Sequence, residues 1–449
     1  MYKEIILKEI ENWRRKLEKL ALDIWNNPEA GLHEFQAQAW TASLLEEAGF
    51  DVILGYGGLK TSICASYGSG KPVYGLLGEY DALPDLSQQV CTFHNPVVPG
   101  GLGHGCGHNL LGTAHVGAAI AVKKLIESGK LNGTVVFFGC PAEEILAGKG
   151  IMARNGAFND LDFNISFHPG THNDVMLGNL TGVKSFKLHF KGRSAHAGAY
   201  PWDGRSALDA LELTHSGINY LREHVPDGVR MHYVITNGGF VPNIVPDRAS
   251  GWYNVRAHKL DVLEDVYNRV IDIAKGAALM TGTEVDVEMI SGCYPTLNNH
   301  VLAKTMHQIM SETPQEPWTE GELQFAAALN KNVSLKRHLH TGVTGLAVRN
   351  GYGSSDAGDV EHICPGIFFS TACYNIAAGG HTWQNTACTG SSIGLKGMIY
   401  AAKVMALFGA KVMSDPDLLA AAKAEFEEKT QGVSYVCPVP NDSSLLSKG

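Results

Sequence analysis

The sequence has little of what marks export, a membrane anchor or nucleic-acid binding. Its charged start, residues 1–20, has no apolar core followed by a small-residue cleavage site, so it does not resemble a signal peptide. Apolar stretches such as "GTAHVGAAIAVKKL" (112–125) are broken by His and Lys well before membrane-spanning length. The net charge is −9 and no Lys/Arg cluster stands out. We therefore expect a cytoplasmic protein that binds neither membrane nor nucleic acid.

The nine cysteines are scattered, odd in number and include no Cys-x-x-Cys pair. In a large chain without an export signal, this pattern indicates reduced thiols rather than a disulfide framework. Most of them are expected to be small buried hydrophobic residues, so a cysteine proposed for chemistry must be distinguished by its neighbours.

Several catalytic motifs are also missing. There is no His-Glu-x-x-His and no phosphate-binding or dinucleotide loop. "GSSIG" (390–394) matches the nucleophile elbow of serine hydrolases, but that mechanism needs a histidine after Ser392, and the last histidine is His381. We interpret the motif as a helix N-terminus capped by serine.

At 449 residues, with 45% hydrophobic and 18% charged residues, the chain is expected to form more than one domain. Strands and helices alternate through residues 1–181, which predicts an α/β layer with a central, mostly parallel sheet. Residues 182–293 follow a strand–helix–strand–strand–helix–strand order, typical of a ferredoxin-like α+β domain. We predict that this domain is inserted in the larger one, which residues 294–449 complete.

"GHGCGHN" (103–109) contains the first candidate metal ligands. Cys106 and His108 are two residues apart, and a thiolate with an imidazole suits a borderline-soft ion such as zinc. The flanking glycines allow unusual backbone angles. Alone, the motif is equally compatible with a Gly-rich turn that holds a buried thiol.

Later strand ends favour the metal interpretation. Glu143 and Glu144 follow the apolar strand 134–139, and His168 follows another short strand. Ligands bind at the carboxyl ends of strands in α/β sheets, so these side chains can meet there. One glutamate could bind metal while the other acts as general base, although an acidic helix start is a common alternative. His381 lies in a Gly-rich loop after another strand and completes a plausible set.

The sequence resembles a known family over nearly its whole length, in the family's order. The motifs are "NPEAGLHEFQAQAW", "GEYDALP", "GHGCGH", "GCPAEE", "FHPG", "GRSAHAG", "GGFVPNIVPDRASGWYNVR" and the late Gly-rich His loop. The family is the aminoacylase, hippurate hydrolase and auxin-conjugate hydrolase group of two-metal metallopeptidases and amidohydrolases. "GHGCGHNLLGTA", "SSDAGDV" and "GHTWQ" are most similar to its p-aminobenzoyl-glutamate hydrolase branch.

The resemblance implies roles for the matching residues. It implies two divalent ions, zinc or manganese, and Glu143 as the general base. His196 matches a histidine that reaches an active site across a dimer and polarises the scissile carbonyl, and Asn243 and Arg256 match contacts to the substrate's carboxylate. The implied metal ligands are Cys106, His108, Glu144, His168 and His381.

Without the resemblance, His196 would be interpreted as a surface histidine and Asn243 as a turn residue. His94, His104 and His115 are expected to be structural. Asn109 departs from the wider family, which has Asp after Cys-Gly-His, and an amide cannot supply a carboxylate's charge.

The resemblance thus implies an amidohydrolase acting on small N-acyl or N-aroyl amino acids, as a homodimer or higher oligomer. The alternatives are a dipeptidase or aryl-amine hydrolase using the same site, or a metal-binding partner of a second subunit that is inactive alone.

Overall fold

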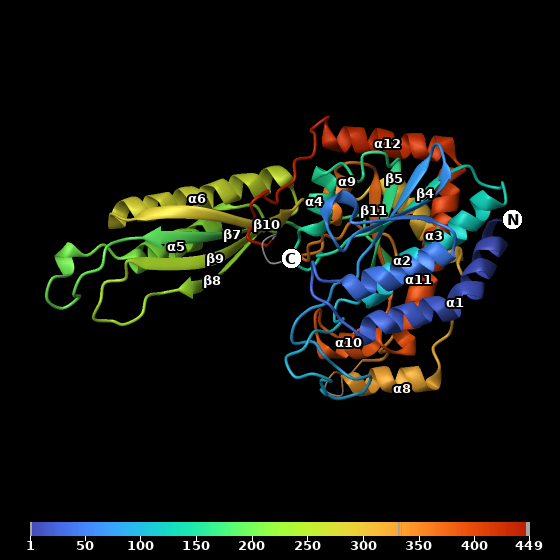
Figure 1. The fold of residues 1–449 in the computed structure, drawn as a ribbon, viewed down its shortest axis with the longest axis horizontal. Helices are drawn as coiled ribbons and strands as arrows, with labels where there is room; N and C mark the ends of the chain where they lie inside the picture. The colour runs from blue at the N-terminus through green and yellow to red at the C-terminus, as the bar shows by residue number, and fades with distance from the viewer. Residues whose placement is uncertain (1, 331–332, 334, 446–449) are drawn as a thin grey trace. The chain divides into compact units, whose positions relative to one another are not determined.

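The computed structural model describes residues 2–330, 333 and 335–445 (Figure 1). It divides the chain into two compact units. Unit 1 consists of residues 1–178, 297–350 and 359–436, and unit 2 of residues 179–296, 351–358 and 437–449. Each unit has its own hydrophobic core.

Unit 1 is built on a seven-stranded sheet of order β1-β2-β4-β3-β5-β11-β6. The four central strands β4, β3, β5 and β11 are parallel, whereas β2 and β6 pair antiparallel to their neighbours. This confirms the predicted mostly parallel sheet. The strands are β1 Asp51–Leu54, β2 Ile63–Ser69, β3 Val73–Gly78, β4 Gly133–Gly139, β5 Phe163–Gly170, β6 Asp174–Val175 and β11 Gly366–Ala372.

Helices α1, α3 and α11 pack against one another in unit 1. Gly117 of α3 allows this packing, because a Cβ there would lie 2.9 Å from Leu17 of α1 and 3.2 Å from Ala402 of α11. Helix α11 is apolar enough to cross a membrane by length and composition, but its most apolar window is 78% buried, as in a core helix. The helices are α1 Tyr2–Asn26, α2 Phe35–Glu47, α3 His108–Glu127, α4 Gly148–Arg154, α7 His300–Glu312, α8 Glu320–Leu329, α9 Ala357–Glu361, α10 Trp383–Thr389, α11 Ser392–Met413 and α12 Pro416–Thr430.

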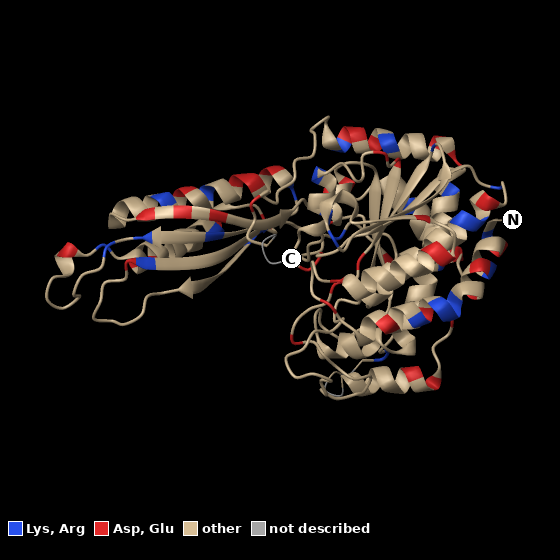
Figure 2. Cartoon of the chain, in the orientation of Figure 1, with Lys and Arg blue, Asp and Glu red and all other residues tan. Residues whose placement is uncertain are grey.

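The charged residues of the outer helices are mixed in sign. Basic and acidic residues are interspersed along α1 and α12 (Figure 2). Pairs such as Lys19–Asp23 on α1 and Lys411–Asp415 at the end of α11 each join opposite charges one helical turn apart. Such exposed pairs contribute little to stability, typically about 0.3–0.5 kcal/mol each.

Unit 2 is an antiparallel sheet of order β10-β7-β9-β8 with two helices. This strand order, with the βαββαβ sequence of elements, confirms the ferredoxin-like fold. In β7, Phe186, Leu188 and Phe190 are buried with helix residues, whereas Lys187 and His189 between them are partly exposed. The alternation shows that one face of the sheet carries the core. The elements are β7 Gly182–Lys191, α5 Ala207–Leu221, β8 Arg230–Asn237, β9 Arg248–Ala257, α6 Leu260–Thr281 and β10 Glu284–Cys293.

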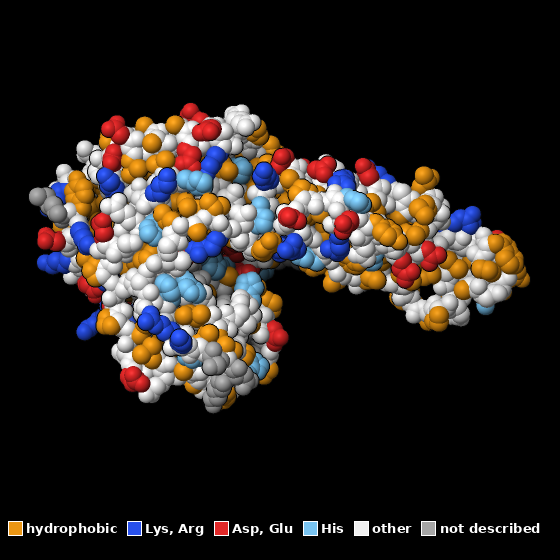
Figure 3. Space-filling model, turned by 180° about the vertical axis from the view of Figure 1, so that it is seen from behind, with side chains coloured by type: hydrophobic (Ala, Val, Ile, Leu, Met, Phe, Trp, Pro, Cys, Tyr) orange, Lys and Arg blue, Asp and Glu red, His pale blue; other side chains and the backbone are white. Residues whose placement is uncertain are grey.

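Unit 2 also exposes several large hydrophobic side chains, visible as orange atoms on its surface (Figure 3). Phe240 is 96% exposed, Leu279 84% and Trp202 69%. Exposed apolar side chains mark interaction surfaces where they form a contiguous patch.

Candidate active site

The candidate ligands of unit 1 gather at one edge of its sheet. Glu143 and Glu144 follow β4, His168 lies near the end of β5, and His381 lies in the loop after β11. Since β4, β5 and β11 are parallel, their carboxyl ends open on the same edge, where ligands bind in α/β sheets. His108 is the first residue of α3, which places Cys106 at the same edge.

Sγ of Cys106 lies 3.1 Å from Nε2 of His168. Gly107 makes the Cys-Gly-His turn possible. Its φ is +84°, and a Cβ there would lie 2.6 Å from the hydroxyl of Tyr374. That hydroxyl donates a hydrogen bond to the carbonyl of Cys106. The glycine is therefore required both by backbone conformation and by space.

His108 is oriented by Asp81, which the sequence analysis did not assign. Its Nδ1 lies 2.9 Å from Oδ1 and 3.0 Å from the carbonyl oxygen of Asp81. Its Nε2 has no hydrogen-bond partner and lies 3.2 Å from Oε2 of Glu79 and 3.9 Å from Oε1 of Glu144. A carboxylate on one ring nitrogen fixes the tautomer that leaves the other nitrogen available to a metal.

The two glutamates after β4 lie on a strained turn. Ala142 has a φ of +61°, a conformation that residues with a Cβ rarely adopt. Its N–H donates to Oε1 of Glu34 at 2.8 Å, and the N–H of Glu144 donates to Oδ2 of Asp81 at 2.9 Å. Two buried carboxylates thus hold the backbone on either side of Glu143. Such strain is retained where the surroundings fix it, commonly at functional sites.

Glu34 was also not predicted from the sequence, although it lies in the motif "NPEAGLHEFQAQAW". The hydroxyl of Thr61 donates to its other oxygen at 2.7 Å. Burial, followed by the charge of Asp81, raises the pKa of Glu34 to about 7. Its contact with Ala142 spans 108 residues, a proximity that no local pattern reveals.

His381 is the most exposed of the predicted ligands. Its side chain is 55% exposed, and Nε2 lies 3.9 Å from Oε2 of Glu144. It too has a positive φ, +51°. Together with Cys106 and His168 it lines a pocket of about 350 Å³, whose wall also includes Tyr374 and Asn385. Three of the five predicted ligands therefore line a pocket of a size that suits a small molecule.

The donor atoms form three groups, and the atoms within each group lie within 4.8 Å of one another. Two of the groups share Cys106, and one contains Glu79, which was not predicted. The described donors are sulfur, imidazole and carboxylate, a set that suits zinc and other divalent transition metals. The groups are Cys106, His108 and His168; Cys106, Glu144 and His381; and Glu79, His108 and Glu143.

The pKa shifts in the site follow from burial and from the charges of its members on one another. Burial raises the pKa of the Cys106 thiol well above its usual value and that of Glu144 to about 7. Burial lowers the pKa of His108, but Cys106, Glu79 and Asp81 outweigh this effect and hold it well above normal. The groups that stabilise a proton there also attract a metal ion, which in turn favours the deprotonated thiol and carboxylate.

Asn109 has a structural reason for being an amide. It is fully buried, and its Nδ2 donates to the carbonyls of Ala21 and Thr389, each at 3.2 Å. A carboxylate in this place would face two carbonyl oxygens without a proton to donate.

The neighbouring histidines bond to backbone. His104 Nε2 lies 3.2 Å from the carbonyl of Ile24, and His115 Nδ1 lies 2.8 Å from that of Leu111. "GSSIG" begins helix α11, where Ser391 caps the N-terminus and accepts from the N–H of Ile393.

The predicted substrate residues lie in unit 2, and the structure brings only two of them together. His196 and Ile244 form a β-bridge, and the N–H of Ala197 donates to the carbonyl of Asn243 at 3.0 Å. Nδ1 of His196 lies 3.2 Å and 3.1 Å from the N–H nitrogens of Gly198 and Ala199. An Nδ1 that accepts these bonds carries no proton, so in the neutral ring the proton is on the exposed Nε2.

Arg256 lies at the other end of this sheet. It pairs with Val183 near the start of β7. The two segments that carry His196 and Asn243 continue from the opposite end of β7 and β9, beyond the Lys191–Arg248 pair. Eight residues of strand separate Arg256 from Arg248, or about 26 Å at roughly 3.3 Å per residue. Arg256 donates to His232 Nε2 at 3.2 Å and to the hydroxyl of Ser354 at 2.9 Å.

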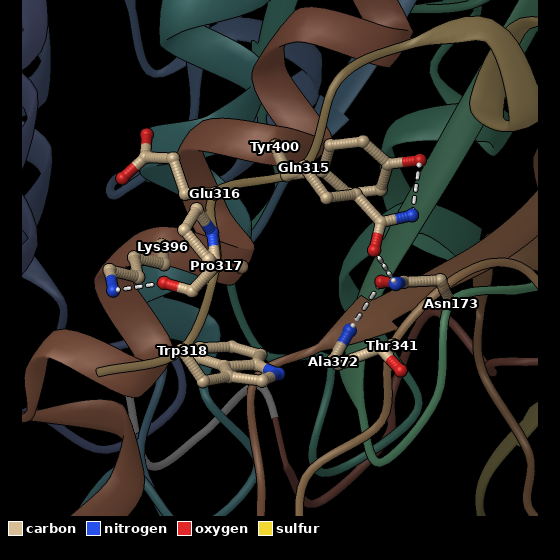
Figure 4. A pocket seen from close by; sticks show the side chains of 10 residues that line it. Asn173, Gln315, Glu316, Pro317, Trp318, Thr341, Ala372, Lys396 and Tyr400 are labelled. Atoms are coloured by element: carbon tan, nitrogen blue, oxygen red, sulfur yellow. Dashed lines mark hydrogen bonds between the residues drawn. The ribbon is translucent and has the colours of Figure 1, made fainter. Parts of the chain in front are cut away.

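A second pocket of unit 1, of about 220 Å³, shares no lining residue with the first (Figure 4). Its polar side chains already bond to one another. Asn173 donates to Gln315 at 3.2 Å and accepts from the N–H of Ala372, and Lys396 donates to the carbonyl of Pro317. The side chains of Asn173 and Lys396 are thus already engaged within the protein.

Comparison with known proteins identifies the class to which this site belongs. Residues 75–333, more than half of the chain, match the model of peptidase family M20/M25/M40. The chain therefore belongs to this family, whose members are hydrolytic enzymes acting on amide bonds.

Particular relatives agree with this assignment. The chain is 39% identical to one of the subunits of p-aminobenzoyl-glutamate hydrolase from Escherichia coli (strain K12), over 96% of each chain. It is 29% identical to Xaa-Arg dipeptidase of Mus musculus, over 94% of this chain and 92% of the relative. A dinuclear metal binding peptidase of the M20 family from Bacillus subtilis has a TM-score of 0.61 at 18% identity, over 89% of this chain and 99% of that one. The last likeness supports the fold.

Proposed function

We propose that the protein is a metal-dependent amidohydrolase that cleaves the amide bond of N-acyl or N-aroyl amino acids. One observation carries the proposal. Cys106, His108, Glu144, His168 and His381, five donors from four separate segments, converge at the carboxyl edge of the sheet with Glu143 beside them.

Two divalent ions, zinc or manganese, fit these donors. Cys106 belongs to two of the three groups, so one ion would be held among Cys106, His108 and His168 and the other among Cys106, Glu144 and His381. Three buried atoms that lack a hydrogen-bond partner, on Glu79, His108 and Glu144, support this assignment. Such ions activate a water for attack and polarise the scissile carbonyl.

Glu143 is the proposed general base. It is buried, and its Oε2 lies 3.8 Å from Nε2 of His108. In this role its carboxylate takes the proton of the attacking water and later passes it to the leaving amine. The hydrogen bonds from Ala142 and Glu144 to Glu34 and Asp81 keep the backbone of Glu143 in place.

His196 is the proposed donor to the carbonyl oxygen. Its Nδ1 accepts from backbone, so its Nε2–H is free to donate to the negative charge that develops on that oxygen. Asn243 lies beside it and would contact the substrate's carboxylate. Arg256 would bind that carboxylate in a bidentate manner.

The separation of these residues supports a site shared between two copies of the chain. A single unit 2 cannot present Arg256 and Asn243 to one amino-acid carboxylate across more than about 26 Å of strand. In a homodimer, Arg256 of one copy can act with His196 and Asn243 of the other. The exposed Phe240, Trp202 and Leu279 of unit 2 favour such self-association.

The relatives narrow the substrate class. The relative at 39% identity is named for hydrolysis of p-aminobenzoyl-glutamate, which favours an N-aroyl amino acid. The relative at 29% identity is named an Xaa-Arg dipeptidase, so a dipeptidase is the second candidate.

The first relative is named as a subunit, which also suggests a partner chain, but the complete donor set with Glu143 favours an active chain. The nine free cysteines favour a reducing compartment such as the cytoplasm.

The test is hydrolysis by the purified chain alone, after its metal content has been measured. The panel should hold N-acyl amino acids, N-aroyl amino acids including p-aminobenzoyl-glutamate, and dipeptides ending in arginine, each with and without a chelator. We expect chelator-sensitive hydrolysis of the N-aroyl substrates. Metal-loaded protein that hydrolyses none of the panel would contradict the proposal, and activity restricted to dipeptides would select the second candidate.

A further inference from the structure

The buried carboxylate of Glu79 is not explained by the proposed ligand set. It directly follows β3, and its side chain is 4% exposed. Its Oε2 has no hydrogen-bond partner, although a buried unpaired carboxylate oxygen is costly. The same oxygen lies 3.2 Å from Nε2 of His108, which also lacks a partner.

Neighbouring groups hold both atoms in this arrangement. Lys149, fully buried on α4, donates to Oε1 of Glu79 at 2.5 Å, which turns Oε2 toward His108. Asp81 engages Nδ1 of His108, which leaves Nε2 facing Glu79. A hydrogen bond to the other oxygen of Glu79 and one to the other ring nitrogen of His108 thus hold the two unpaired atoms 3.2 Å apart.

Their spacing is that of two ligands on one ion. Nitrogen and oxygen donors bound to zinc lie at roughly 2.0–2.2 Å from it, so two of them in a tetrahedral site are roughly 3.3–3.5 Å apart. The observed 3.2 Å is close to this value. Glu79, His108 and Glu143 also form a donor group distinct from the two that share Cys106.

We infer that Glu79 is a further ligand of the divalent ion held by His108, and that Lys149 anchors it. The inference rests on the proposed two-metal site and adds a residue to it. It gives the His108 ion a carboxylate besides the sulfur and imidazole donors, so its affinity and spectrum depend on Glu79. Lys149 offsets part of the carboxylates' charge and sets which oxygen of Glu79 faces the ion.

The experiment measures metal binding rather than turnover. Wild type, Glu79→Gln and the double variant Glu79→Gln/Lys149→Met are dialysed against graded metal buffers, and bound zinc is counted per chain. The double variant removes both charges together, because one charge left alone in the interior can prevent folding. Glu361→Gln is the matched control, since Glu361 is a fully buried carboxylate of unit 1 outside the three donor groups, also with one unpaired oxygen.

We expect one of two ions to bind about 10–100-fold more weakly in both Glu79 variants, and not in Glu361→Gln. In cobalt-substituted protein, we expect the visible bands of that ion to change. Equal affinities and an unchanged cobalt spectrum in a folded Glu79 variant would overturn the inference and leave the two-metal proposal standing. A wild-type chain that binds no metal under these conditions would overturn the proposal itself.

Discussion

The sheet edge of unit 1 and the surface of unit 2 place their predicted functional residues in opposite ways. At the edge, donors from distant segments lie within a few ångströms of one another: Cys106 and His108 are buried, Glu144 and His168 are partly buried, and His381 is exposed. In unit 2, His196 and Asn243 are exposed on neighbouring segments beyond one end of the sheet, and Arg256 lies at the other end. We propose that the first region holds metal by itself, whereas the second needs another copy of the chain before its residues can meet.

The largest expected effect is at the general base. Glu143→Gln keeps the size of the side chain but cannot accept a proton, so kcat should fall about 10²–10⁴-fold while metal content is retained. The measurement is kcat together with bound metal per chain. A variant that keeps its metal and the wild-type rate would remove Glu143 from this role.

The next effect tests the exposed region. His196→Ala removes the proposed donor to the carbonyl oxygen and should lower kcat about 10²–10³-fold. The side chain is exposed, so we expect no change in melting temperature or metal content. His189→Ala, another partly exposed histidine of unit 2, is the control and should keep full activity. Equal rates for both variants would contradict the role of His196.

A smaller effect is expected at Glu34, which supports the site from behind. Glu34→Ala leaves the buried N–H of Ala142 unpaired, which costs about 1–3 kcal/mol of stability. Displacement of Glu143 should lower kcat roughly 10-fold or more, with a smaller change in KM. Glu34→Gln, which can still accept from Ala142, should recover most of the rate. A Glu34→Gln variant as slow as Glu34→Ala would argue against positioning through this bond.

Glu34 also gives the stability a pH dependence. Its pKa is about 7 in the folded chain, above the ordinary value of 4.5, so folding favours the protonated form. The stability it contributes is complete below about pH 4.5 and is lost as the pH rises through about 7. This titration spans about pH 5 to 8. Over that range, the melting temperature of the metal-free wild type should therefore fall more than that of Glu34→Gln. Parallel curves for the two proteins would contradict this.

The smallest effect concerns stability at Asn109. Asn109→Asp loses the donors to Ala21 and Thr389 and places a carboxyl group against two carbonyl oxygens. We expect a loss of about 1–3 kcal/mol in the free energy of unfolding, growing with pH as the carboxyl group is driven to ionise. Denaturant unfolding at two pH values measures it. An unchanged midpoint would show that the amide is not required there.

The sequence predicted one region better than the other for a physical reason. Strands that run parallel bring their carboxyl ends together, so Cys106, Glu144 and His168 could be grouped from strand order alone. Glu79 and Asp81 follow β3 in the same way, and two carboxylates two residues apart after a buried strand were a usable signal. Glu34 could not be found in this manner, because its contact with Ala142 depends on the tertiary fold.

In unit 2 the elements were predictable but the distances were not. Alternation in β7 and the order of strands and helices indicated the ferredoxin-like fold. Nothing in the sequence showed that Asn243 lies beside His196 while Arg256 is a strand's length away, because that follows from the β-bridge and the sheet register.

The most direct test of this contrast is complementation between two inactive variants. His196→Ala and Arg256→Ala chains are purified separately, mixed under conditions that allow subunits to exchange, and assayed. If the site takes Arg256 from one copy and His196 from the other, random pairing gives one intact site in each mixed dimer, and activity should return to about a quarter of wild type. No recovery in a mixture shown to contain mixed dimers would contradict the shared site. It would mean that His196 and Arg256 of one chain act together.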